Sequence, residues 1–165
     1  MAGGCMYKNP LLTTDGSDIA KAAIPHVAQI VDPAGRVTVV EVIDEIGHVL
    51  AMTSPSNGFD FGSTGEIDAE IAEQIIATQR ETAEAHLAEA KSALTAAGIK
   101  NVDTAVVQGL PGDRIVEEAQ TRKSDVIVMS THGRSGFRRA VLGSVADHVL
   151  RNTEGVPVLL VHPAS

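Results

Sequence analysis

The sequence predicts a doubly wound α/β domain, in which a five-stranded parallel sheet of order 3-2-1-4-5 carries helices on both faces. Short β-branched runs alternate with helical patterns along the whole chain, which is typical of strand–helix–strand units. The length of 165 residues fits a single domain. Because 44% of the residues are hydrophobic and only 2% are aromatic, Val, Ile, Leu and Ala must fill the core. That composition suits helices packed on a parallel sheet.

Five apolar runs are predicted to be strands. Each run is short, rich in Val, Ile or Leu, and bounded by turn-forming residues. They span residues 10–13, 36–43, 101–108, 125–130 and 157–161. Because parallel strands need right-handed crossovers, the intervening helices should cover both faces of one sheet.

Helices are predicted between the strands, where apolar residues recur at helical spacing. The first spans about 17–30, and the longest spans about 65–97 with Gly98 as its stop signal. A short helix lies around 115–119, and the last helix reaches about residue 151.

Two segments are expected to lie outside this regular pattern. Residues 1–8 are interpreted as an N-terminal tail, and residues 44–64 as a long, flexible polar loop. The loop is either a disordered insertion or a mobile flap in which Phe59 or Phe61 closes over a ligand.

Charge and cysteine content exclude several classes of function. The formal net charge of −8 argues against nucleic acid or an anionic membrane as a partner. Cys5 is the only cysteine, so neither a disulfide framework nor a cysteine-rich zinc site is possible. The histidines lack metal-ligand spacing, and neither a Walker A sequence nor a GxGxxG pattern is present. No apolar run approaches the roughly 20 residues of a membrane span, and we expect a soluble cytoplasmic protein.

The stretch from Ser130 to Ser144 joins a predicted strand to a predicted helix through glycines and hydroxyl side chains. Ser144 is placed to cap the helix, and the backbone N–H groups at a helix start can hold an anion such as phosphate. Ligands of doubly wound sheets bind where the strand order reverses, here between the first and fourth strands. The loops at that point are 13–16 and 130–144. Topology and composition therefore predict an anion site at one place, with a simple capped connection as the alternative.

Several segments together resemble the universal stress protein family, and the resemblance covers essentially the whole domain. The segments are residues 10–17, 40–42, 109–112 and 125–162. The resemblance implies a Rossmann-like fold of the adenine nucleotide alpha hydrolase type.

The most specific element of the resemblance is the family's ATP-binding signature, Gly-x2-Gly-x9-Gly-(Ser/Thr). Ser130, Gly133, Gly143 and Ser144 align with it at the right spacings. Ser130 departs from the signature, because it adds a hydroxymethyl group where a glycine backbone approaches the ligand. The match otherwise favours the ATP-binding branch of the family, with Mg²⁺ accompanying the phosphates.

The resemblance also assigns roles to individual positions. It implies that the phosphates are held at Gly133, Gly143, Ser144 and the amide of Val145. Asp15 resembles the acidic residue near the ribose and adenine, with a helix cap as its alternative role.

Further positions surround this implied site. Val42 and Met129 resemble apolar residues of the adenine slot, although plain core packing is an equal alternative. The remaining candidate positions are Thr13 and Thr14 in the first loop, and His132 and Arg134 in the glycine-containing loop. No residue is assigned to catalysis.

The function predicted from these observations is that of an ATP-binding regulatory or stress-response protein whose nucleotide state or dimer surface is read by an unidentified protein partner. The alternatives are a slow ATPase and an interaction module with a vestigial nucleotide site. The resemblance further implies a homodimer formed through the last strand, residues 157–161.

Overall fold

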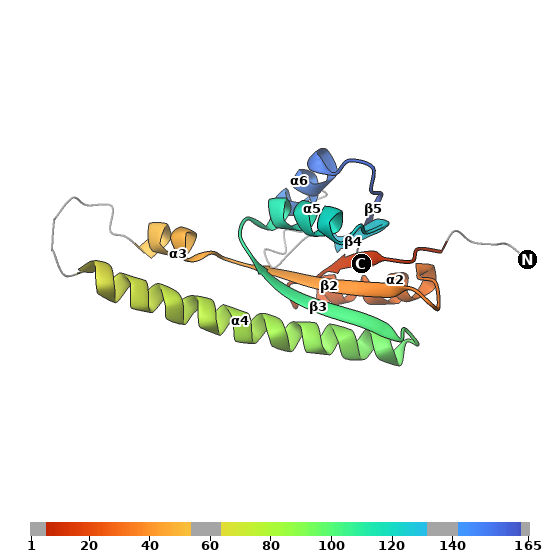
Figure 1. Ribbon diagram of the computed structural model, residues 1–165, viewed down its shortest axis with the longest axis horizontal. Helices are drawn as coiled ribbons and strands as arrows, with labels where there is room; N and C mark the ends of the chain where they lie inside the picture. The colour runs from red at the N-terminus through yellow and green to blue at the C-terminus, as the bar shows by residue number, and fades with distance from the viewer. Residues whose placement is uncertain (1–5, 54–63, 132–141, 163–165) are drawn as a thin grey trace, which may run out of the picture.

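The computed structural model describes residues 6–53, 64–131 and 142–162. Five parallel strands form one sheet in the order β3-β2-β1-β4-β5, which confirms the predicted fold class and strand order (Figure 1). The strands are β1 (Pro10–Thr13), β2 (Arg36–Ile43), β3 (Asn101–Gln108), β4 (Val126–Ser130) and β5 (Val158–Val161). The order reverses between β1 and β4, so the carboxyl ends of these two strands border the switch point.

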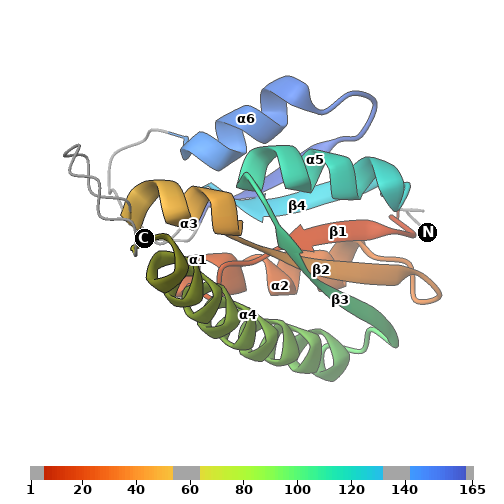
Figure 2. The ribbon, with the colours of Figure 1, turned by 60° about the vertical axis from the view of Figure 1, so that its left-hand side comes forward.

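Helices lie on both faces of the sheet (Figures 1 and 2). One face carries α1 (Asp18–Lys21), α2 (Ile24–Ile30) and α4 (Thr64–Ala96), and the other carries α5 (Pro111–Thr121) and α6 (Ser144–Asn152). A further helix, α3 (Ile46–Thr53), follows β2 and contacts α4.

The central strands are buried on both sides because successive side chains point to opposite faces. In β1, Leu11 joins the core under α5 and α6, whereas Leu12 joins the core under α2 and α4. In β2, Val40 and Val39 divide in the same way. This explains why β1 and β4 are almost continuously apolar and do not alternate with polar residues.

The segment predicted as one helix over 17–30 forms two short helices. Pro25 lies in the first turn of α2, where its missing N–H group costs no helical hydrogen bond. In one continuous helix the same proline would remove a bond to the carbonyl of Lys21. The chain therefore ends α1 at Lys21 and restarts at Ile24.

Residues 44–64 do not form one polar loop, because Ile46–Thr53 is helical. Val49 in α3 is 7% exposed and packs in a cluster with Ile43 of β2 and Ile76 of α4. This apolar contact stabilises the helical conformation of residues 46–53. Phe59 and Phe61, the residues of the expected flap, lie outside the described residues.

The expected N-terminal tail is shorter than residues 1–8. The Tyr7 N–H donates to the carbonyl of Ile30 at 2.8 Å, and the Tyr7 carbonyl accepts from the N–H of Asp32 at 2.7 Å. The Lys8 N–H donates to the Asp125 carboxylate at 2.6 Å. Tyr7 and Lys8 are thus part of the folded body.

The longest element is α4, which has 33 residues. Its C-terminal half packs on the sheet through Leu87 and Leu94, whereas its N-terminal half runs beyond the sheet alongside α3 (Figure 1). None of the helices in the described part of the chain combines the length and the apolarity that a membrane crossing requires.

Candidate functional site

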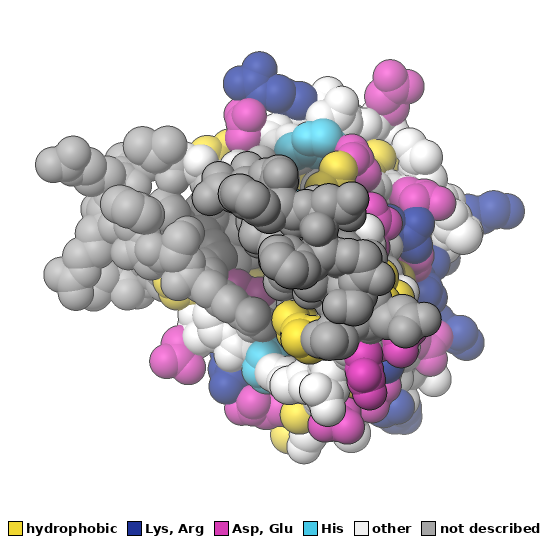
Figure 3. Space-filling model, turned by 90° about the vertical axis from the view of Figure 1, so that its left-hand side faces the viewer, with side chains coloured by type: hydrophobic (Ala, Val, Ile, Leu, Met, Phe, Trp, Pro, Cys, Tyr) yellow, Lys and Arg dark blue, Asp and Glu magenta, His cyan; other side chains and the backbone are white. Residues whose placement is uncertain are grey.

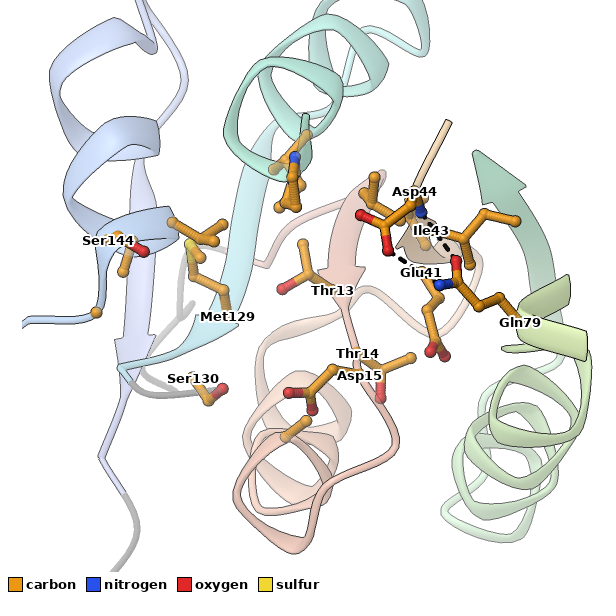
Figure 4. A pocket seen from close by; sticks show the side chains of 18 of the residues that line it. Thr13, Thr14, Asp15, Glu41, Ile43, Asp44, Gln79, Met129, Ser130 and Ser144 are labelled. Carbon is orange, nitrogen blue, oxygen red and sulfur yellow. Dashed lines mark hydrogen bonds between the residues drawn. The ribbon is translucent and has the colours of Figure 1, made fainter. Parts of the chain in front are cut away.

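A cavity of about 550 Å³ opens at the carboxyl ends of β1, β2 and β4, at the switch point of the sheet (Figure 4). It is lined by three strand ends, the β1–α1 loop, the first turns of α5 and α6, and one turn of α4. The lining residues are Thr13, Thr14, Asp15, Ala20, Val40, Glu41, Val42, Ile43, Asp44, Thr78, Gln79, Thr82, Pro111, Ile115, Met129, Ser130, Thr131, Gly143, Ser144, Val145 and Ala146.

One end of the cavity is formed by the start of α6. Gly143 is the N-cap, and its N–H donates to the carbonyl of Thr131 at 2.9 Å. The first intrahelical bond runs from the Asp147 N–H to the Gly143 carbonyl, at 2.9 Å. The amides of Ser144, Val145 and Ala146 precede that bond, so they offer N–H groups and the positive end of the helix dipole to a ligand. Ser144 is predicted to cap the helix but is its first residue; the N-cap is Gly143, and among the described residues no side chain caps this helix.

The β1–α1 loop forms the floor of the cavity. The Thr14 N–H donates to the Val40 carbonyl at 3.0 Å, which extends the sheet pairing into the loop. Asp15 Oδ1 accepts from the N–H of Ser17 at 3.0 Å and from its hydroxyl at 2.6 Å. The N-cap of α1 is Ser17, whose hydroxyl accepts from Ala20 at 3.2 Å. Asp15 therefore does not cap the helix itself; it orients the residue that does.

A second layer of residues fixes this loop against α4. Gly16 has a φ of +75°, and a Cβ atom there would lie 2.3 Å from the ring of His86. His86 Nδ1 in turn lies 3.1 Å from both carboxylate oxygens of Glu41. Glu41 is only 3% exposed and lines the cavity. The His86 ring thus connects a buried carboxylate in the cavity wall to the loop that carries Asp15.

Apolar side chains from three elements line the middle of the cavity. Met129 is 4% exposed and shares a core cluster with Val40 and Ile115, while Val42 is half-buried and packs against the same cluster. Each of these residues also lines the cavity. Val42 and Met129 therefore pack with the core and also line the cavity, and their assignment to an adenine slot stays a prediction.

A hydrogen-bonded pair closes the end of the cavity opposite α6 (Figure 4). The Asp44 N–H donates to Gln79 Oε1 at 3.1 Å, and Gln79 Nε2 donates to Asp44 Oδ2 at 2.9 Å. This pair links the residue that follows β2 to the middle of α4.

Ser130 and Thr131 stand where the glycine-containing loop leaves β4. Ser130 is in register with Val161 of β5, and the Thr131 N–H donates to the carbonyl of Val161 at 3.1 Å. The Thr131 hydroxyl also lies 2.9 Å from Nδ1 of His162. The base of the loop is thus held by β5 on one side and by Gly143 on the other.

The structure brings most of the predicted positions together around one cavity. Those that line it are Thr13, Thr14, Asp15, Val42, Met129, Ser130, Gly143, Ser144 and Val145. His132, Gly133 and Arg134 lie outside the described residues.

Sequence reasoning missed the polar residues that reach the cavity from β2 and α4. These are Glu41, Asp44, Thr78, Gln79 and Thr82. A signal was present in the two carboxylates that flank Val42 at the end of a predicted strand, because that end belongs to the ligand-binding edge. No local sequence pattern indicates which residues of α4 lie against this edge of the sheet.

The electrostatics of the described cavity wall are acidic. Asp15, Glu41 and Asp44 line it, whereas no Lys or Arg occurs among the described lining residues. Asp147, in the first turn of α6, does not line the cavity; a hydrogen bond from Arg151 at 2.8 Å lowers the pKa of its carboxyl. Acidic side chains are also spread over the described surface around this edge (Figure 3). Within the described ranges, no group of three or more His, Cys, Asp or Glu residues could hold a metal ion.

Fold and site together define a doubly wound α/β domain with a cavity at its switch point and the first turn of a helix in the wall of that cavity. Residues 6–162 match the model of the Universal stress protein family, and the chain belongs to this family.

Two relatives from Methanocaldococcus jannaschii illustrate the relationship. The chain is 32% identical over 160 residues to the universal stress protein MJ0531, covering 96% of this chain and 84% of that protein. It is 31% identical over 164 residues to the universal stress protein MJ0577, covering 94% of this chain and 95% of that protein.

Solved structures agree in fold. The MJ0577 structure superposes with a TM-score of 0.78 at 27% identity and covers 97% of this chain and 99% of that chain. A universal stress protein in complex with cAMP gives a TM-score of 0.62 at 24% identity, covering 96% of this chain and 99% of that chain. At that lower identity the likeness concerns the fold alone.

Proposed function

We propose that this chain binds ATP together with Mg²⁺ in the switch-point cavity, and that it acts as a regulatory protein in a stress response. Nucleotide occupancy changes the surface or the dimer that a protein partner reads.

The observation that carries the proposal is that backbone amides, a carboxylate and an apolar surface line one cavity of about 550 Å³. The first-turn amides of Ser144, Val145 and Ala146, which have no intrahelical acceptor, suit phosphate oxygens. Asp15 supplies an acceptor for ribose hydroxyls, and the apolar surface of Val42 and Met129 suits the faces of a base.

Mg²⁺ is part of the proposal because both ATP and the described cavity wall are negatively charged. A triphosphate is strongly anionic, and the described wall contributes carboxylates. Mg²⁺ bound through phosphate oxygens offsets this repulsion without a protein-built metal cage.

The first experiment identifies the ligand directly. Purified protein is denatured, the released small molecules are separated by chromatography, and the refolded or ligand-free protein is titrated calorimetrically with ATP, with and without Mg²⁺. Saturable binding that weakens when Mg²⁺ is chelated supports the proposal, and absence of nucleotide affinity under both conditions contradicts it.

A charge placed at the helix start tests the location. We expect Ser144→Glu to lower ATP affinity at least about fivefold, because a carboxylate beside the first-turn amides repels phosphate by about 1 kcal/mol or more at close range. The control is Gln120→Glu, which adds the same charge at the exposed far end of α5. Equal ATP affinity in the two variants would place the phosphates elsewhere.

The same variants separate regulation from catalysis. Multiple-turnover phosphate release that disappears in Ser144→Glu would assign a slow ATPase to this cavity. Stoichiometric binding without turnover supports a nucleotide-dependent regulator.

We further propose that two copies pair through β5. This strand ends the sheet, with β4 on its one paired side, and Leu159 is 36% exposed. A second copy related by a two-fold axis can satisfy the open backbone groups of such an edge.

A further inference from the structure

Asp44, the residue that follows β2, lines the cavity beside its apolar wall. It follows Val42 by two residues, is half-buried, and lines the cavity at the end away from Ser144. Its carboxyl group points toward the cavity in Figure 4. A nucleotide whose phosphates lie at α6 therefore extends its base toward Asp44.

The amide of Gln79 fixes the orientation of this carboxylate. The Asp44 N–H can only donate, so the group 3.1 Å from it must be the amide oxygen of Gln79. The amide nitrogen of Gln79 is then the group that donates to Asp44 Oδ2 at 2.9 Å. Gln79 thus requires an acceptor at Oδ2 and leaves Oδ1 as the oxygen available to a ligand.

The two threonine hydroxyls that line the cavity on this side also present acceptors. The Thr78 hydroxyl donates to the carbonyl of Gln74 at 2.9 Å, and the Thr82 hydroxyl donates to the carbonyl of Thr78 at 2.9 Å. Their protons are committed to the helix backbone, so the oxygens that remain can only accept. Glu41 adds another carboxylate to the same wall.

We propose that Asp44 determines base specificity by accepting a hydrogen bond from an exocyclic amine, and that Gln79 is its positioning residue. The inference rests on the proposed nucleotide-binding function. The predicted ligand class is a 6-aminopurine nucleotide in preference to a 6-oxopurine nucleotide. A 6-oxo group at this place sets one acceptor against another, and both lose their water on binding.

The test compares ATP with ITP, which carries a 6-oxo group, in calorimetric titrations with Mg²⁺. We expect the wild-type chain to bind ATP at least about tenfold more tightly, the effect of one mismatched polar contact. In Asp44→Asn, Gln79 still requires an acceptor, so the Asn oxygen faces Gln79 and the Asn NH₂ group faces the base. The donor now suits the 6-oxo group, and we expect the preference to be abolished or reversed.

Two further variants isolate the effect. Gln79→Ala removes the orienting amide, and we expect it to narrow the ratio of the two affinities while nucleotide binding persists. Asp103→Asn makes the same chemical change at an exposed ion pair with Arg36, and we expect it to leave the ratio unchanged. Thermal melts establish that each variant is folded.

The outcomes distinguish this inference from the proposed function. If the wild-type chain binds neither nucleotide, both fall together. If it binds ATP and ITP equally, or if Asp44→Asn and Gln79→Ala keep the wild-type ratio, base reading by Asp44 is overturned while nucleotide binding stands.

Discussion

At the scale of single residues, two glycines next to the cavity make room for imidazole rings from neighbouring helices. A Cβ on Gly16 would lie 2.3 Å from the ring of His86, and one on Gly112 would lie 2.5 Å from that of His148. Gly16 stands in the β1–α1 loop, and Gly112 stands in the first turn of α5. Both segments contribute residues to the cavity wall, so each ring supports one side of the site.

The clearest test of such a contact is Gly16→Ala. We expect it to lower the free energy of unfolding by about 1–2 kcal/mol for the positive φ, with a further loss from the contact with His86. Because the loop must shift to admit the methyl group, ATP affinity should also fall. Chemical denaturation and calorimetry give the two quantities.

Gly98→Ala is the matched control for that substitution. Gly98 has a φ of +97°, but nothing lies within 4 Å of the place a Cβ would take. This variant should lose stability from backbone strain alone and keep its ATP affinity. If Gly16→Ala and Gly98→Ala reduce ATP affinity equally, the His86 contact does not position the loop.

These residues show which parts of the site a sequence can predict. The hydrogen bonds among Asp15, Ser17 and Ala20 are local, and the spacing of polar residues after a strand indicates them. The contact of Gly16 with His86 joins residues far apart in the chain, and it depends on the rotation of α4 about its axis. No local pattern specifies that rotation, so the supporting layer was not predictable.

At the scale of elements, β2 and β3 were predicted with the same bounds that the structure shows, whereas α3 was missed. Both strands have eight residues rich in β-branched side chains, and a glycine turn lies directly before β2 and directly after β3, so their limits are clear in the sequence. The helix α3 is short, and its described contact with α4 is made through Val49. Its partner, Ile76, lies beyond a polar stretch that dominates the local composition.

The packing of α3 on α4 can be measured through Ile76. This residue is 7% exposed in the cluster with Ile43 and Val49. We expect Ile76→Ala to cost about 2–5 kcal/mol in the free energy of unfolding, because it leaves a cavity in that cluster. Urea denaturation monitored by circular dichroism measures the difference.

The control for Ile76→Ala lies on the same helix. Ile71 is 45% exposed, so Ile71→Ala should change the free energy of unfolding by less than about 0.5 kcal/mol. Similar costs for the two substitutions would mean that α3 does not cover Ile76.

At the scale of the whole molecule, the acidic surface and the sheet edge at β5 favour different kinds of contact. The formal net charge of −8 disfavours close approach of another acidic surface. The apolar edge at β5 offers a contact of a different kind, because its backbone groups pair without charge. Leu159 of β5, which is 36% exposed, adds apolar area at that edge.

The oligomeric state therefore depends on β5 in our proposal. Leu159→Lys places a charge on the sheet edge, which opposes strand pairing between copies, and we expect the mass measured by light scattering to halve from dimer to monomer. Thr104→Lys makes a comparable change at an exposed residue of β3, the strand at the opposite edge of the sheet, and should leave the dimer intact. A monomeric wild-type mass at micromolar concentration, or a dimer that survives Leu159→Lys, would contradict pairing through β5.

Because Ser130 and Thr131 are joined to Val161 by the sheet, loss of the dimer should also loosen the base of the glycine-containing loop. Parallel titrations of the monomeric variant with ATP then show whether assembly and nucleotide binding are coupled.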